Sequence, residues 1–158
     1  MYIRSPEHLK NICKKAMASL VAVVMLFSLG VRQVYAEQSV VLIAARGSGI
    51  EAISNRDIRR IFLGLKSADS EMVNRPVLNM YDREVFEDFL KNVMHMTEGA
   101  YKRKLVKRVF RNGAAEIKEI DRLQDLNEHL LNNVGDVSFV DSSAVDMMDD
   151  IEVVKVLW

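Results

Sequence analysis

SVVLIAARGSG, residues 39–49, holds the clearest strand pattern in this sequence. Residues 39–45 form a nearly continuous run of β-branched and aliphatic side chains, which is typical of a strand covered on both faces in a parallel sheet. The glycines of Arg46-Gly47-Ser48-Gly49 then predict a loop. We therefore expect a buried strand that is followed directly by a polar turn.

A helix is predicted immediately after this loop. Ser54 offers a hydroxyl N-cap, Asp57 adds an acid to the first turn, and Ile58, Ile61 and Phe62 fall on one helical face. Gly64 is placed to end the helix with a left-handed residue. The chain therefore changes from strand to helix within about ten residues, as α/β folds do.

Further strands and helices alternate along the chain. They are a strand over 76–80, a helix with Phe86, Phe89, Leu90 and Val93 on one face, a helix capped by Thr97, a helix capped by Asp121 and followed by Gly135, and strands over 137–140 and 151–158. This order predicts an α/β three-layer sandwich with a mostly parallel sheet. Ligands of such sheets bind beyond the carboxyl ends of the strands.

The first 36 residues have the pattern of a cleavable secretory signal. Arg4, Lys10, Lys14 and Lys15 precede an apolar run over 16–31. The run spans roughly 24 Å as a helix, less than the ~30 Å of a bilayer core. We expect cleavage after Ala36, a periplasmic domain over 37–158, and membrane contact only through the signal before cleavage. An uncleaved anchor is the alternative.

Composition excludes several classes of function. The chain has a formal net charge of zero, and removal of the basic signal leaves an acidic domain, so we expect no binding to nucleic acid. The single cysteine, Cys13, lies before the apolar run, so the domain can form neither a disulfide nor a zinc-thiolate site.

We expect no enzymatic activity, no cofactor and no metal. The sequence has no HExxH or GxSxG motif, and the histidines after residue 36, His95 and His129, have no serine and carboxylate at a recognisable spacing. Met94-His95-Met96 offers copper ligands, but three consecutive residues point to different sides of a helix.

ISNRDIRRIFLG, residues 53–64, resembles the segment L-S-x-x-x-L-R-x-I-F-L-G of the phosphate-binding proteins that serve bacterial phosphate ABC transporters. Residues 75–77, 82–83 and 134–140 resemble later segments of that family in the same order. The resemblance implies a type II periplasmic-binding-protein fold, and the length implies about one lobe. It also implies phosphate or a related oxyanion as ligand and an inner-membrane permease as partner.

Two segments depart from the family pattern. The family's arginine and its Ser-Gly-Thr hydroxyl cluster are replaced by Arg83-Glu84-Val85-Phe86, and the family's Gly-Ala-Ile-Gly-Tyr-Val is replaced by residues 135–140, GDVSFV. The arginine is kept, whereas the hydroxyl ligands are lost.

Five residues are candidates for an oxyanion site: Arg46, Ser48, Asp82, Arg83 and Ser138. Binding an anion requires dense donors, such as a bidentate arginine and converging backbone amides. The alternative for residues 46–49 is a flexible loop, and for Asp82 and Arg83 a local ion pair in a turn.

Positive charge is concentrated on the helix that follows Thr97, at Lys102, Arg103, Lys104, Lys107, Arg108 and Arg111. This pattern indicates either a solvated face or a surface that docks an acidic partner or anionic lipid. Two hypotheses follow. One is a small solute-binding protein for phosphate or a related oxyanion, and the other is an adaptor that docks a membrane sensor or channel.

Overall fold

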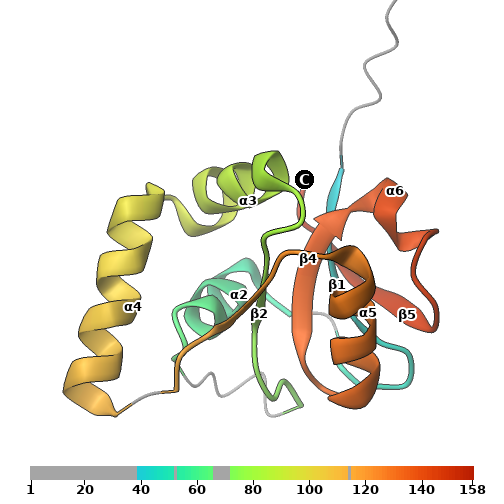
Figure 1. The fold of residues 1–158 in the computed structure, drawn as a ribbon, viewed down its shortest axis with the longest axis horizontal. Coiled ribbons are helices and arrows are strands. Elements are labelled where there is room, and N and C mark those ends of the chain that lie inside the picture. Colours follow the sequence, from blue (N-terminus) through green and yellow to red (C-terminus); the bar gives the residue numbers. More distant parts are fainter. Residues whose placement is uncertain (1–38, 52, 66–71, 114) are drawn as a thin grey trace, which may run out of the picture. The chain divides into compact units, whose positions relative to one another are not determined.

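Strand β1, Val40–Ala45, is buried along its whole length and pairs on both edges (Figure 1). Its neighbours are β4, Val137–Asp141, and β5, Ile151–Val156. Alternate residues of β1 belong to two different core clusters, with Leu42 in one and Ile43 in the other. The predicted burial of this strand on both faces is confirmed.

The computed structural model describes residues 39–158 except 52, 66–71 and 114. The predicted signal over 1–36, with its cleavage after Ala36 and Cys13, lies outside these residues. Residues 38–158 form one compact unit. Within the described residues, no helix is both long and apolar enough to span a bilayer.

The predicted direction of β1 is wrong, because β1 runs antiparallel to both β4 and β5. Strand β2, Val77–Asn79, is parallel to β3, Lys118–Ile120, and a parallel bridge from Pro76 to Val137 places β2 beside β4. Strands β2 to β5 therefore share one direction and β1 opposes them. The strands form two sheets, an antiparallel one in the order β4-β1-β5 and a parallel one of β2 and β3, in place of the expected single, mostly parallel sheet. An apolar run reports burial of a strand, whereas its direction depends on partners elsewhere in the chain.

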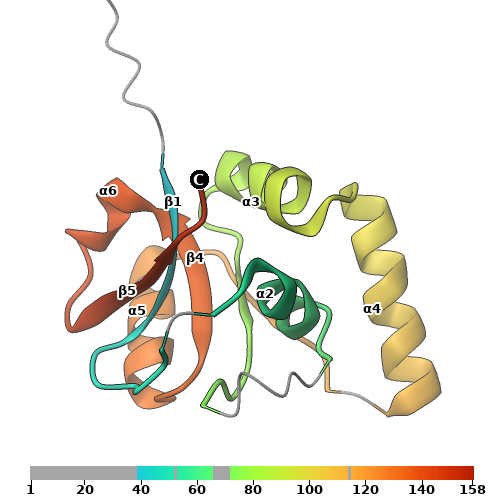
Figure 2. The ribbon, with the colours of Figure 1, turned by 180° about the vertical axis from the view of Figure 1, so that it is seen from behind.

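Helices cover both faces of the strands, as the opposite views of Figures 1 and 2 show. One core cluster joins β1 to α2, Asn55–Phe62, to α3, Arg83–Phe89, and to a π-helical turn η1, Leu90–Met94. The other joins β1 to α5, Leu123–Asn132, and α6, Ser142–Val145. The described chain is therefore a single mixed α/β domain.

The first core cluster contains four phenylalanines, and three of them are in ring contact. The rings of Phe89 and Phe139 stack with their centroids 3.9 Å apart, and Phe62 meets the edge of Phe89 at 4.8 Å. All three side chains are fully buried. This contact joins α2, α3 and β4, and aromatic pairs of this kind add to the free energy gained by burying their area.

Local helix signals are mostly confirmed. Ser54 and Thr97 cap α2 and α4, Glu98–Asn112, and Gly135 has the expected positive φ of 98°. The predicted cap at Asp121 is wrong, since α5 is preceded by Arg122, whose side chain makes no capping hydrogen bond. Strand β3, helix α6 and the π turn were not predicted, because elements of three to five residues carry little periodicity.

Two side chains of α4 hold this helix against the C-terminal end of α2. The Tyr101 hydroxyl donates to the Phe62 carbonyl at 2.7 Å, and Arg108 donates to the Leu63 carbonyl at 2.5 Å. These carbonyls lack partners within their own helix, so both bonds satisfy groups that would otherwise be unpaired. The next residue, Gly64, is left-handed, and a Cβ there would collide with the Arg108 guanidinium.

Strand β5 contains a bulge. Leu42 pairs with Lys155 and Ile43 with Val153, so the register skips Val154. The bulge turns Lys155 inward, where its ammonium donates to the Ile53 carbonyl at 2.9 Å. Val156 nevertheless remains 60% exposed on this strand.

We expect Tyr101→Phe to destabilise the protein by ~1 kcal/mol at neutral pH, because the Phe62 carbonyl loses its donor. Burial, with a smaller contribution from Glu119, raises the pKa of Tyr101. Because the pKa of Tyr101 is higher in the folded than in the unfolded chain, its contribution to the free energy of unfolding is fully present below about pH 10. That contribution is lost as the pH rises further, since the tyrosine then ionises more readily in the unfolded chain. Urea unfolding at pH 8 and pH 11 should therefore show a smaller difference in the free energy of unfolding between the parent and Tyr101→Phe at pH 11.

The matched control is Tyr81→Phe, which removes a hydroxyl from a half-exposed side chain. It should leave the free energy of unfolding unchanged relative to the parent at both pH values. A gap for Tyr101→Phe that stays constant with pH would contradict the assignment of Tyr101 as the buried titrating group.

Candidate functional site

The predicted oxyanion residues lie at two opposite edges of the strands. Arg46 and Ser48 follow the carboxyl end of β1, which lies beside the start of β4 because Ala44 pairs with Val137. Asp82 and Arg83 follow β2, which runs parallel to β4 and whose last residue, Asn79, donates to the Phe139 carbonyl in the middle of β4. The reversed direction of β1 therefore separates the two halves of the predicted site.

The loop over 46–49 binds a carboxylate that belongs to the chain itself. Ser48 donates its hydroxyl to Glu152 at 2.8 Å, and the Gly47 amide donates to the other oxygen of that carboxylate at 3.4 Å. Arg46 lies 3.9 Å from Asp150 in an exposed pair. The Gly47 amide and the Ser48 hydroxyl therefore converge on an anion, but that anion is Glu152 of the same chain, and Arg46 does not join them.

Asp82 and Arg83 do not pair with each other. Asp82 caps α3 by accepting from the amides of Glu84 and Val85 at 3.0 and 3.1 Å. Arg83 donates to Glu87 at 2.8 Å and also binds Glu98. The arginine that matches the family motif therefore already has two carboxylate partners.

Ser138 is fully buried within β4, and its hydroxyl donates to the Val77 carbonyl at 3.0 Å. This bond joins β4 to β2 next to the single bridge between these strands. A side chain in this position supports the sheet and is not accessible to a ligand. No two of the three parts of the predicted site therefore lie at the same place on the surface.

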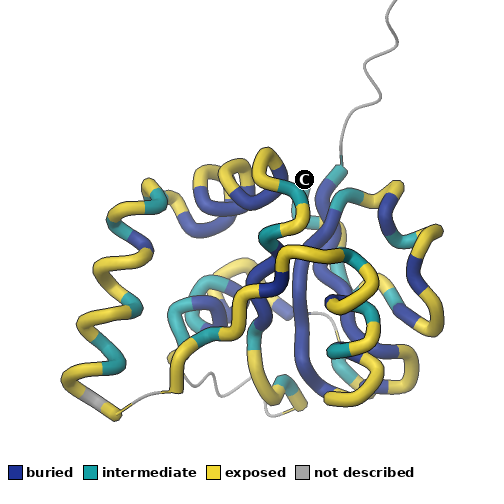
Figure 3. Tube along the Cα trace, viewed as in Figure 1, coloured by how far each residue is buried: buried dark blue, intermediate teal, exposed yellow. Residues whose placement is uncertain are grey.

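Helix α4 has two different faces. Tyr101, Leu105 and Arg108 face the rest of the domain, as the contacts to α2 require. We define the outer face of α4 as the opposite face, which consists of Arg103, Val106, Lys107 and Phe110. Figure 3 shows exposed residues along the whole length of this helix, with buried and intermediate residues between them.

The outer face of α4 combines an exposed aromatic ring with positive charge. Phe110 is 85% exposed and Val106 is 53% exposed. Six Lys and Arg lie on α4 against one acid, Glu98. In the part of the chain that the structure describes, only Lys102 makes an ion pair, and Arg108 donates to the Leu63 carbonyl. The other four make no ion pair: Arg103, Lys104, Lys107 and Arg111.

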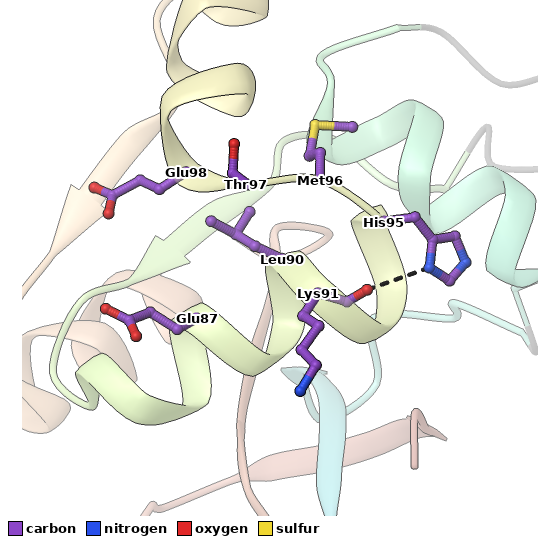
Figure 4. Close-up of a pocket in the computed structure, with 7 residues that line it drawn as sticks. All are labelled: Glu87, Leu90, Lys91, His95, Met96, Thr97 and Glu98. Atoms are coloured by element: carbon purple, nitrogen blue, oxygen red, sulfur yellow. Dashed lines mark hydrogen bonds between the residues drawn. The ribbon is translucent and has the colours of Figure 1, made fainter.

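A surface cavity lies where η1 turns into α4 (Figure 4). Its volume is about 450 Å³, within the range of small-molecule sites. Leu90, Met96 and Thr97 line it, together with charged or titratable side chains at Glu87, Lys91, His95 and Glu98. In the sequence, Met94-His95-Met96 marks this region, but these residue types suggest copper ligands and not a cavity wall.

The copper ligands considered from the sequence do not meet. Met94 is buried in the core, and Figure 4 shows the His95 and Met96 side chains pointing apart. The second histidine, His129, contacts Asp136 at 3.0 Å and Lys118 at 3.0 Å. Among residues 39–158, apart from the gaps given above, no three His, Cys, Asp or Glu side chains are grouped to hold a metal.

Comparison with known proteins gives no family assignment. No family model matches the chain, and no curated protein matches it. The geometry of the described residues is therefore the basis for proposing a function.

A double-mutant cycle tests the internal carboxylate contact. Ser48→Ala and Glu152→Gln should each destabilise the fold by ~1 kcal/mol or more, with a coupling of about 1 kcal/mol, because a hydrogen bond to a charged acceptor links them. Chemical denaturation of the parent, both single variants and the double variant measures this coupling. Asp150→Asn removes only the exposed pair with Arg46 and should change stability by less than ~0.5 kcal/mol. Additive effects of Ser48→Ala and Glu152→Gln would contradict the contact.

Proposed function

We propose that this chain is an exported, non-enzymatic adaptor of the periplasm, and that the outer face of α4 docks an acidic protein partner such as a membrane sensor or channel. The observation that carries the proposal is Phe110, a large aromatic side chain that is 85% exposed on a basic helix. Export rests on the signal pattern of residues 1–36.

An exposed aromatic ring surrounded by cations has the chemistry of a protein-binding surface. Aromatic and arginine side chains supply most of the free energy at interfaces, and complementary charges around them raise the rate of association. Arg103 and Lys107 flank Phe110 on the same face and are exposed. The rest of the domain is acidic in net charge, so its attraction to an acidic partner is strongest at this helix.

The anchoring of α4 supports the same proposal. Tyr101 and Arg108 fix the helix to α2 through two backbone carbonyls. The outer face is therefore presented by a helix whose orientation is set before any partner binds, which lowers the entropy lost on docking. Arg108 is part of this anchor and does not belong to the docking surface.

Binding of phosphate or a related oxyanion is the second candidate function. The resemblance of residues 53–64 supports it, as do helices on both faces and a common direction for β2 to β5, which suit one lobe of a type II periplasmic-binding-protein fold. The engaged donors Ser48, Arg83 and Ser138 favour the adaptor instead. An ABC permease is the partner that this second candidate requires.

Site-specific photo-crosslinking tests docking. A photoreactive phenylalanine at position 110, in the full chain in its native cells, should give one discrete crosslinked protein. Arg103→Glu with Lys107→Glu should lower its yield at least fivefold, because two attractive contacts become repulsive. Arg56→Glu with Arg75→Glu is the control with equal charge change at exposed sites and should leave the yield unchanged.

Other outcomes would assign the surface differently. The same probe at Met147, which is 64% exposed, should give no such product. A product at position 110 that is insensitive to Arg103→Glu with Lys107→Glu would contradict charged docking. Sedimentation with phosphatidylglycerol vesicles but not with phosphatidylcholine vesicles, lost in that double variant, would replace the protein partner by a membrane surface.

Calorimetric titration separates the second candidate from the adaptor. We expect no heat from phosphate or sulfate at low salt, because the predicted donors already bind side chains of this chain. Micromolar affinity for phosphate that Arg83→Ala abolishes would establish the solute-binding function instead. The crosslinking pattern at position 110 is independent of this result.

A further inference from the structure

The cavity between η1 and α4 has an uncompensated positive charge. Glu87 binds Arg83, and Glu98 binds both Arg83 and Lys102, so two carboxylates are balanced by two cations. The same contacts lower the pKa of Glu98 and keep it ionised. Lys91 also lines the cavity and makes no ion pair with any described residue. One positive charge is left over at this site.

The charges are divided between two sides of an apolar centre. Figure 4 shows the Glu87 and Glu98 carboxylates on one side of Leu90, and the Lys91 and His95 side chains on the other. The Leu90 side chain points toward Thr97, and Met96 lines the same cavity. A ligand with an apolar body and one anionic group matches this division, because its anionic end can approach Lys91 and avoid the carboxylates.

The cavity wall is held in place by the backbone. The π turn ends at His95, a left-handed residue with φ of 54°, and the Met96 amide donates back to the Leu90 carbonyl at 3.0 Å. His95 donates its Nδ1 hydrogen to the Lys91 carbonyl at 3.2 Å. Val93 anchors the turn in the core. A π turn and a left-handed histidine are unusual backbone states that occur preferentially at functional sites.

We propose that this cavity binds a small organic monocarboxylate with an apolar body. Lys91 contacts the carboxylate, and Leu90 and Met96 contact the body. This site is separate from the outer face of α4, so it stands or falls independently of the proposed function. None of the five predicted oxyanion residues lines it, although Arg83 binds two of its carboxylates from outside. It also differs from a phosphate site, since phosphate has no apolar part to bury.

Amide chemical shifts report this binding directly. Sodium hexanoate added to the isotope-labelled chain, purified as cells produce it, should shift the amides of residues 87–98 saturably, with a Kd on the order of millimolar for so small a ligand. Lys91→Glu should weaken binding at least fivefold. Lys104→Glu, an exposed lysine of α4 outside the cavity, should leave the Kd unchanged.

Three further ligands test the chemistry. Sodium acetate, which lacks the apolar body, should bind at least fivefold more weakly, and hexylammonium and inorganic phosphate should give no saturable shifts at these amides. The proposal is overturned if hexanoate fails to saturate, if Lys91→Glu and Lys104→Glu behave alike, or if hexylammonium or acetate binds as well as hexanoate. Correct folding of each variant is checked by the unchanged amide shifts of β1.

Discussion

Backbone pairing along both edges of β1 joins residues 40–45 to strands that begin at residues 137 and 151. Because β1 contributes residues to both core clusters, this pairing connects the helices on one face of the strands to those on the other. The direction of β1 determines where the polar residues that follow the strands reach the surface. It sends the loop over 46–49 to one edge of the strands and leaves α3 at the other.

This constraint explains why donors typical of an anion site are engaged within the chain. Ser48 meets Glu152 because β1 and β5 run antiparallel, so the end of one strand lies beside the start of the other. Arg83, at the opposite edge, is surrounded by carboxylates of α3 and α4. These pairs stay partly or largely exposed to solvent, so the fold supplies the nearest partners without burying the charges. In the described part of the chain, α4 carries the largest group of cations without an ion pair.

Features that depend on residues close together in the sequence were predicted correctly. Hydroxyl caps at Ser54 and Thr97, the left-handed Gly64 and the two-sided burial of residues 40–45 follow from local sterics and hydrogen bonding. The direction of β1 and the contact between Ser48 and Glu152 were not predictable, since they join residues about 100 positions apart. The π turn was not predicted because one extra residue hardly disturbs the helical spacing of Phe86, Phe89 and Val93.

The bulge in β5 affects how this edge strand can pair with a strand of a neighbouring molecule. In the described part of the chain, β5 forms the outer edge of its sheet and carries exposed valines, so a regular strand here would be a template for a neighbouring molecule. Skipping Val154 breaks the repeat of free amides and carbonyls, and the inward Lys155 sets a charge where a stacked strand would need an apolar contact. The same irregularity that binds Ile53 therefore protects the folded protein from edge-to-edge aggregation.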